Sequence, residues 1–175
     1  MLTPHRFSAL LGVLLLTLLA IALPGPAGAD GGGGGQGAIT NPGKPEDPQY
    51  TAAVKAIKAN EYAKAIPLLQ GVVSRDDKNA DAYNWLAYAT RKTGDPAASL
   101  PLYQKALAID PKHKGAHEYI GEAYLMLDNL AKAKEHLTTL SSLCLITCGE
   151  YRDLKRAVDA YEKSGGRSKP TASSW

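Results

Sequence analysis

Residues 80–113 read ADAYNWLAYATRKTGDPAASLPLYQKALAIDPKH, and residues 114–147 repeat the same order of small, large and turn-forming residues. At a period of 34 residues, similar residues align: Leu86 with Ile120, Ala87 with Gly121, Gly94 with Asp128, Ser99 with Ala133, and Tyr103 with Leu137. Periods of this length are typical of stacked helical hairpins. The chain is therefore predicted to be all-α and to form a solenoid, an architecture that usually holds partners rather than reacting with them.

A fainter copy precedes these two, so that the repeats are predicted at 46–79, 80–113 and 114–148. Between the two expected helices of each copy stand Asn60, Gly94 and Asp128. All three residue types tolerate the left-handed backbone conformation that ends one helix and lets another begin. The pattern thus predicts about three hairpins with turns at equivalent positions.

Small and large apolar residues alternate at helical spacing along these hairpins, which is the pattern of a packed seam between helices. The small residues are expected where the two helices of a hairpin approach closely, and the larger ones fill the gaps between them. The predicted seam consists of Ala53, Ala87, Gly121, Ala65, Ser99, Ala133, Leu69, Tyr103, Leu137, Val72, Ala106 and Leu140.

A last amphipathic helix is predicted at residues 149–163. Its charged residues lie on one side. Its apolar side chains share a stripe on the other side, which consists of Tyr151, Leu154, Ala157, Val158 and Tyr161. A solenoid needs a terminal element that covers its last apolar face and is polar outside. We interpret this helix as a cap, the alternative being an amphipathic helix that binds a partner.

The ends of the chain have a different composition from the repeats. Residues 1–29 hold an apolar run followed by Ala27-Gly28-Ala29, which predicts a secretory signal peptide cleaved before Asp30. A retained membrane anchor is the alternative; after cleavage no stable membrane span is expected. Residues 30–48 are rich in Gly and Pro and are predicted to be a disordered linker, and residues 164–175 a flexible tail.

Charge and motifs narrow the function. Removing the leader removes one of 20 basic residues, Arg6, and leaves 19 against 17 acidic residues. A balance this close to neutral gives no electrostatic case for binding nucleic acid, which requires a basic patch or stripe. No nucleophile elbow or comparable catalytic arrangement is present, so an enzyme is not expected, nor is a cofactor.

Residues 80–113 resemble a tetratricopeptide repeat (TPR). The residues that carry the resemblance are Leu86, Gly94-Asp95, Tyr103, Ala106-Leu107 and Asp110-Pro111. The departures are Ala87, Thr90 and Ser99, where the family usually has glycine, tyrosine and alanine. The third copy keeps Gly121, Tyr124 and Ala133 but lacks the closing proline. The resemblance implies a protein-interaction module.

In TPR folds the first helices line a concave groove, and this resemblance implies a peptide-binding role for the matching positions. They are Tyr50, Val54, Ile57, Asn84, Tyr88, Arg91, Glu118, Glu122 and Leu125. The expected partner is a peptide or protein of unknown identity, with an extended peptide that has apolar anchors and a basic stretch as the compatible shape. The alternatives are ordinary groove surface for each residue, packing between repeats for Tyr88, and solvated acids on an exposed face for Glu118 and Glu122.

Cys144 and Cys148 are the only cysteines. In an oxidising compartment such a pair predicts a disulfide that fastens the end of the third copy to the last helix. Two alternatives remain open: a reversible dithiol, or a soft-metal site for copper or zinc. In the second, His113, His117 or His136 would add a nitrogen ligand, although His117 is more simply a packed histidine.

Residues 115–122 and 144–151, with the Cys144-x-x-x-Cys148 spacing, resemble a group of small exported bacterial repeat proteins. That resemblance implies the periplasm of a Gram-negative bacterium, or otherwise secretion. It implies no reaction.

Overall fold

Seven α-helices and the turns between them make up the described part of the chain. The computed structural model describes residues 47–166; the predicted signal peptide, linker residues 30–46 and tail residues 167–175 lie outside the described residues. No strand occurs between residues 47 and 166. The helices are α1 (Pro48–Lys58), α2 (Tyr62–Arg75), α3 (Ala80–Lys92), α4 (Pro96–Ile109), α5 (Lys114–Met126), α6 (Leu130–Leu143) and α7 (Gly149–Lys163).

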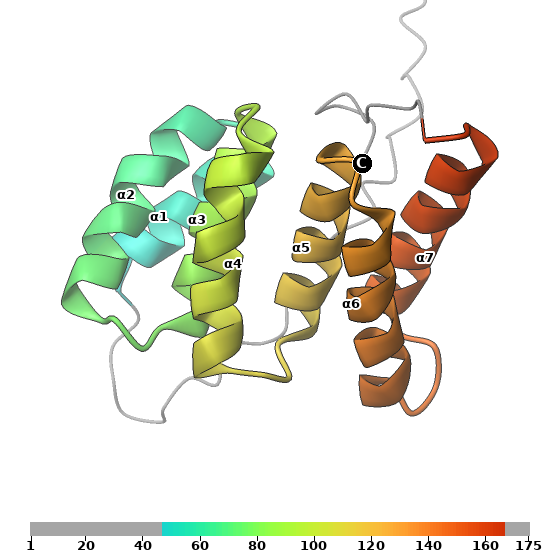
Figure 1. The fold of residues 1–175 in the computed structure, drawn as a ribbon. Coiled ribbons are helices and arrows are strands. Elements are labelled where there is room, and N and C mark those ends of the chain that lie inside the picture. Colours follow the sequence, from blue (N-terminus) through green and yellow to red (C-terminus); the bar gives the residue numbers. More distant parts are fainter. Residues whose placement is uncertain (1–46, 167–175) are drawn as a thin grey trace, which may run out of the picture. The chain divides into compact units, whose positions relative to one another are not determined.

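The helices pack in chain order as antiparallel pairs. α1 contacts α2, α3 contacts α4 and α5 contacts α6, while α2 also contacts α3 and α4 contacts α5. Figure 1 shows α2 and α4 in front of α1 and α3, so that the first and second helices of the first two hairpins form separate layers. The prediction of an all-α solenoid of about three hairpins followed by a last helix is confirmed.

Side chains at the helix starts explain most of the helix boundaries. Asp47, Asn79, Asp95, His113 and Asn129 each accept a hydrogen bond from a backbone N–H in the first turn of the helix that follows. Such caps satisfy N–H groups that have no partner within the helix. Because Asp47 caps α1, the last residues of the predicted linker belong to the start of this helix.

The turns within the three hairpins have the predicted backbone conformation. Asn60, Gly94 and Asp128 have φ values of 59°, 100° and 57°. They are the residues with positive φ between residues 47 and 164. The equivalent register of the three turns therefore arises from residue types that accept this conformation.

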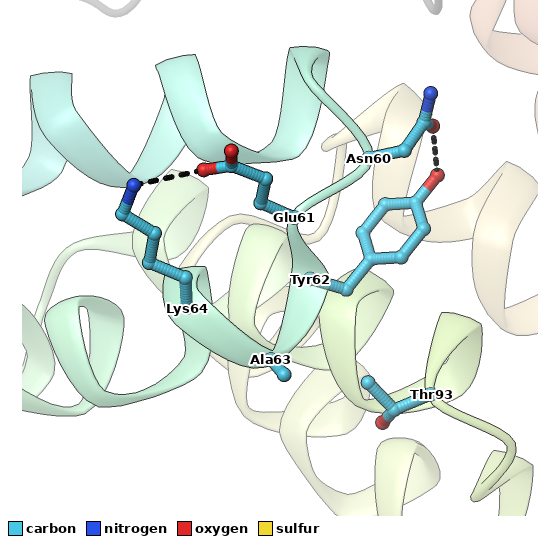
Figure 2. Close-up of a pocket in the computed structure, with 6 residues that line it drawn as sticks. All are labelled: Asn60, Glu61, Tyr62, Ala63, Lys64 and Thr93. Atoms are coloured by element: carbon cyan, nitrogen blue, oxygen red, sulfur yellow. Dashed lines mark hydrogen bonds and ion pairs between the residues drawn. The ribbon is translucent and has the colours of Figure 1, made fainter.

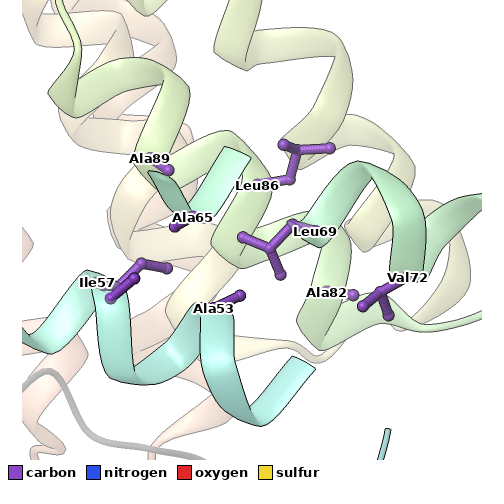
Figure 3. Close-up of a cluster of buried hydrophobic side chains, with 9 residues drawn as sticks. Ala53, Ile57, Ala65, Leu69, Val72, Ala82, Leu86 and Ala89 are labelled. Carbon is purple, nitrogen blue, oxygen red and sulfur yellow. The ribbon is translucent and has the colours of Figure 1, made fainter. Parts of the chain in front are cut away.

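The core follows the seam predicted from the alternation of small and large residues. Every predicted seam residue is buried except Leu137, which is half-buried. Figure 3 shows the first of three clusters, where α1, α2 and α3 meet around Leu69 and Val72. A second cluster surrounds Tyr103 and Ile120, and the third joins α5 and α6 to α7.

Helix α7 covers the end of the array. Its buried stripe is the predicted one, except that Tyr151 is half-buried and Glu150, which was not predicted, is also buried. Leu154 is fully buried and lies against Gly121 of α5: a Cβ at Gly121 would stand 2.6 Å from a Leu154 methyl carbon. Any side chain at position 121 would therefore have to displace Leu154. Within residues 47–166, no helix is long and apolar enough to cross a membrane.

Candidate functional site

The first helices α1, α3 and α5 bring the predicted groove positions into register. We call the side chains at these positions the first-helix face: Tyr50, Val54 and Ile57 on α1, Asn84, Tyr88 and Arg91 on α3, and Glu118, Glu122 and Leu125 on α5. Contacts between α1 and α3 and between α3 and α5 connect the three parts. Tyr50, Val54 and Tyr88 are half-buried, and the other members are buried.

Arg91 and Glu122 form a buried ion pair that joins α3 to α5. The Arg91 Nη2 atom lies 2.7 Å from Glu122 Oε2, and both side chains are nearly inaccessible to solvent. Arg91 Nε also donates to the Tyr103 hydroxyl at 3.4 Å. Burial disfavours the charge of Arg91, but Glu122 and Tyr103 outweigh it and raise the arginine pKa. Arg91 is therefore committed to packing between repeats.

Aromatic rings surround this ion pair. The Tyr88 ring stands 4.8 Å from the Tyr119 ring and 5.6 Å from the Trp85 ring, measured between centroids. The Arg91 guanidinium lies over Tyr88 at 5.3 Å. Trp85 and Tyr88 are only half-buried, so apolar ring surface remains accessible beside the buried charges. Tyr88 therefore packs against the next repeat, as one of the alternatives for this residue stated, and its ring also keeps accessible surface.

Glu118 and Glu122 are buried, with 4 % and 5 % of their surfaces exposed, so the interpretation of both as solvated acids is wrong. The reason lies in tertiary packing, because α5, the helix that carries both residues, packs against both α3 and α7. Glu122 gains Arg91 as a partner, whereas no hydrogen bond or ion pair reaches the Glu118 carboxyl within residues 47–166. Burial, then the neighbouring Glu122, Asp153 and Glu150, raise the pKa of Glu118 to about 9.

Asn84 has the same register position on α3 as Glu118 has on α5. The residue is 4 % exposed, and its Oδ1 atom accepts no hydrogen bond from any described residue. Its amide nitrogen lies against the first turn of α5, where a Cβ on Gly115 would be 3.5 Å away. The first-helix face thus contains two buried residues, Asn84 and Glu118, whose side-chain oxygens accept no hydrogen bond from residues 47–166.

A separate open pocket lies at the turn between α1 and α2. Figure 2 shows it, with Tyr62 donating a hydrogen bond to Asn60 at 2.5 Å and Lys64 paired with Glu61 at 2.9 Å. Ala63 and Thr93 complete the lining. The Thr93 hydroxyl donates to the Thr90 carbonyl outside the pocket, at 2.8 Å.

The two cysteines lie in the segment between α6 and α7. The Cys144 and Cys148 sulfur atoms are 2.06 Å apart and the Cα atoms 5.7 Å apart, at disulfide distance. Between them, Leu145 and Ile146 are exposed. This is the position where the predicted disulfide would fasten the third copy to α7.

The three candidate histidine ligands have partners of other kinds. His113 caps α5 and its Nε2 atom lies 3.1 Å from Asp81 Oδ1. His117 Nε2 donates to the Pro111 carbonyl at 3.0 Å, so its Nδ1 atom accepts from His136 Nδ1 at 2.9 Å. Among the described residues, no group of three or more His, Cys, Asp or Glu side chains is placed to hold a metal ion.

Comparison with known proteins supports the resemblance noted in the sequence. Two sequence profiles described as tetratricopeptide repeat match residues 50–114 and 90–142, and together they span more than half of the 175 residues. The chain belongs to the tetratricopeptide repeat family. No curated protein matches the sequence of this TPR chain.

Solved structures with the same fold include two of one chaperone. The type III secretion translocator chaperone SycD of Yersinia enterocolitica matches with a TM-score of 0.61 at 16 % identity, covering 67 % of this chain and 83 % of that one. SycD in complex with a peptide of the translocator YopD matches with a TM-score of 0.57 at 18 % identity, covering 66 % and 88 %.

A third similar structure is the first TPR of Spaghetti (RPAP3) bound to the HSP90 peptide SRMEEVD. It matches with a TM-score of 0.58 at 19 % identity, covering 65 % of this TPR chain and 90 % of that one. At these identities the three structures establish the fold alone.

Proposed function

We propose that this TPR protein is a non-enzymatic binding module that holds a peptide or protein partner on its first-helix face. Two of the similar structures, SycD and the first TPR of RPAP3, contain a bound peptide. At their low identity, these structures do not indicate which partner this protein binds. Their bound peptides do support peptide binding as the class of function.

One observation carries the proposal: half-buried aromatic rings lie beside buried polar groups that lack partners. Tyr88 and Trp85 provide accessible apolar surface, as anchoring residues of a partner require. Asn84 and Glu118 have hydrogen-bonding capacity that no described residue uses. Leaving buried polar groups unpaired costs free energy, so a partner that satisfies them gains affinity and specificity.

Site-specific photocrosslinking in cells tests the proposal. A photoreactive phenylalanine analogue at Tyr88 is expected to give a discrete adduct, because this position lies on the first-helix face. The same analogue at Gln104, an exposed residue of α4, is the matched control and is expected to give none. Adducts of equal yield at both positions, or at neither, would contradict the proposal.

We propose further that the protein acts after export, in the periplasm of a Gram-negative bacterium. The apolar leader and the short-range cysteine pair support this. The mature protein is expected to begin at Asp30 when its N-terminus is sequenced after isolation from the envelope. An N-terminus at Met1 on membrane-bound protein would support the retained anchor instead.

Under the same proposal, Cys144 and Cys148 form a structural disulfide rather than a redox or copper/zinc site. Thiol titration of protein isolated from its native compartment is expected to find no free thiol. Free thiols together with bound copper or zinc would overturn this assignment.

A further inference from the structure

The charges on the first-helix face point to the chemistry of its partner. We propose that Glu118 receives a lysine or arginine side chain of the bound peptide, so that the face selects a cationic residue at one position. This inference rests on the proposed function and adds the class of side chain that is recognised.

Glu118 is the uncompensated group in an acidic surrounding. Three other carboxyl groups are close enough to affect it: Glu122 on its own helix, and Asp153 and Glu150 on α7. Arg91 is a cation whose charge lowers the pKa of Glu118, but it is bonded to Glu122 at 2.7 Å. Lys92, the next residue on α3, acts on Glu122. Asp153 is paired with Arg156 at 2.7 Å on the exposed side of α7. The Glu118 carboxyl itself has no ion pair among the described residues, so an added cation would compensate it.

Asn84 supplies a second, independent indication of a ligand. Its buried Oδ1 atom has no donor among the described residues. Asn84 occupies on α3, in the second copy, the position that Glu118 occupies on α5 in the third. An ammonium group carries three donors and a guanidinium five, and neither has an acceptor. Such a group has enough donors for both the Glu118 carboxylate and the Asn84 side-chain oxygen.

The alternative of an anionic ligand fits poorly. A peptide such as SRMEEVD, which the first TPR of RPAP3 binds, would add carboxylates to a surrounding where Glu122, Asp153 and Glu150 already disfavour the ionised form of Glu118. Like charges in a site shielded from water repel strongly. The first-helix face of this chain is therefore expected to reject acidic peptides.

Protonation adds a signature that a purely structural role would not produce. In the free protein, burial and the neighbouring acids raise the pKa of Glu118 to about 9, which keeps the carboxyl neutral near pH 7. A bound cation favours the ionised form. Binding is thus expected to release a proton, and affinity for a cationic peptide is expected to rise between pH 7 and pH 9.

The experiment measures binding of paired fluorescent peptides to the protein purified after export. Each peptide is extended, has apolar residues at alternate positions, and carries either lysine or the uncharged isostere norleucine at one scanned position. At the correct position lysine is expected to bind roughly tenfold more tightly than norleucine, which corresponds to about 1.4 kcal/mol. The preference should grow from pH 7 to pH 9 and fall in high salt.

Glu118→Gln preserves the shape of the side chain and is expected to abolish both the lysine preference and its pH dependence. Glu135→Gln, on the exposed side of α6, makes the same change in net charge and is expected to leave both intact. Circular dichroism of each variant checks folding. Proton release by the unmodified protein, measured by calorimetry in buffers of different ionisation enthalpy, tests the same point without a variant.

Two failures are distinguishable. If peptides bind and Tyr88→Ala weakens them, but lysine and norleucine bind equally without proton release, the cation site is wrong and the binding module stands. If no peptide binds and the Tyr88 crosslink is also absent, both the cation site and the proposed binding function are wrong.

Discussion

At the scale of single residues, an unpartnered buried carboxyl makes stability depend on pH. Glu118 has a pKa of about 9 in the folded protein, against about 4.3 in an unfolded chain. The folded state therefore binds more protons than the unfolded state between these values, and stability falls as pH rises. Its contribution is fully present below the unfolded pKa and is lost as pH rises through the folded one.

We expect Glu118→Gln to remove this dependence, because glutamine does not titrate. The free energy of unfolding of the variant, relative to that of the unmodified protein, should increase from pH 5 to pH 9, with a slope of at most about 1.4 kcal/mol per pH unit. Urea unfolding at several pH values measures it. His136, whose pKa burial and His117 lower to about 4, titrates in both proteins and cancels in the difference. A difference that does not change with pH would show that Glu118 is ionised at neutral pH.

The Arg91–Glu122 pair gives a second prediction at this scale. Arg91→Met leaves the Glu122 carboxylate buried without its partner and is expected to cost about 3–5 kcal/mol. Adding Glu122→Leu should recover most of that loss, because two apolar side chains need no compensation. The exposed Lys132–Glu135 pair is the control, and its double replacement should change stability by less than about 1 kcal/mol. Additive effects at Arg91 and Glu122 would contradict direct coupling.

At the scale of elements, the turns decide where each hairpin folds back. Gly94 has φ at 100°, and no atom lies within 4 Å of a Cβ built on it. A substitution there meets backbone strain and no steric contact. Gly94→Ala is therefore expected to lower the free energy of unfolding by about 1–2 kcal/mol.

Gly149→Ala is the matched control for this turn. Its built Cβ also meets no atom within 4 Å, but its φ lies outside the left-handed region. Chemical denaturation should show no loss for this variant, and a gain of about 0.4–1 kcal/mol is expected from the smaller entropy of the unfolded chain. Equal losses at both positions would show that backbone conformation is not the cause at Gly94.

At the scale of the whole molecule, the repeat period allowed much of the fold to be predicted. Equivalent positions in three copies gave the turns and the seam, because each copy must meet its neighbour in the same way. The stripe through Leu154 likewise indicated which side of α7 would be buried. These features depend on spacing along the chain, which a sequence displays directly.

The state of the polar groups on the first-helix face depends instead on distances between helices. Glu118 and Glu122 have the same spacing and chemistry that solvated acids on a surface helix would have, so their burial was not predictable from one helix. Opposite charges at Arg91 and Glu122, in adjacent copies, were the available signal for the ion pair. The contact between His117 and His136 had no comparable signal, since these residues lie on different helices of one hairpin.

The last prediction concerns how α7 is held on the array. Leu154 and Val158 are buried against the third hairpin, whereas the cysteine pair closes a loop of only about five residues, worth roughly 2 kcal/mol by the chain-entropy estimate. Leu154→Ala should therefore lower the free energy of unfolding by about 2–5 kcal/mol. We expect this loss to exceed that of the double replacement Cys144→Ala/Cys148→Ala. Both changes should lower hydrogen-exchange protection in α7 before α3 and α4, because α7 contacts the third hairpin and not the second. Uniform loss of protection along residues 47–166 would mean that the whole array opens as one unit, and that α7 is not a separately releasable cap.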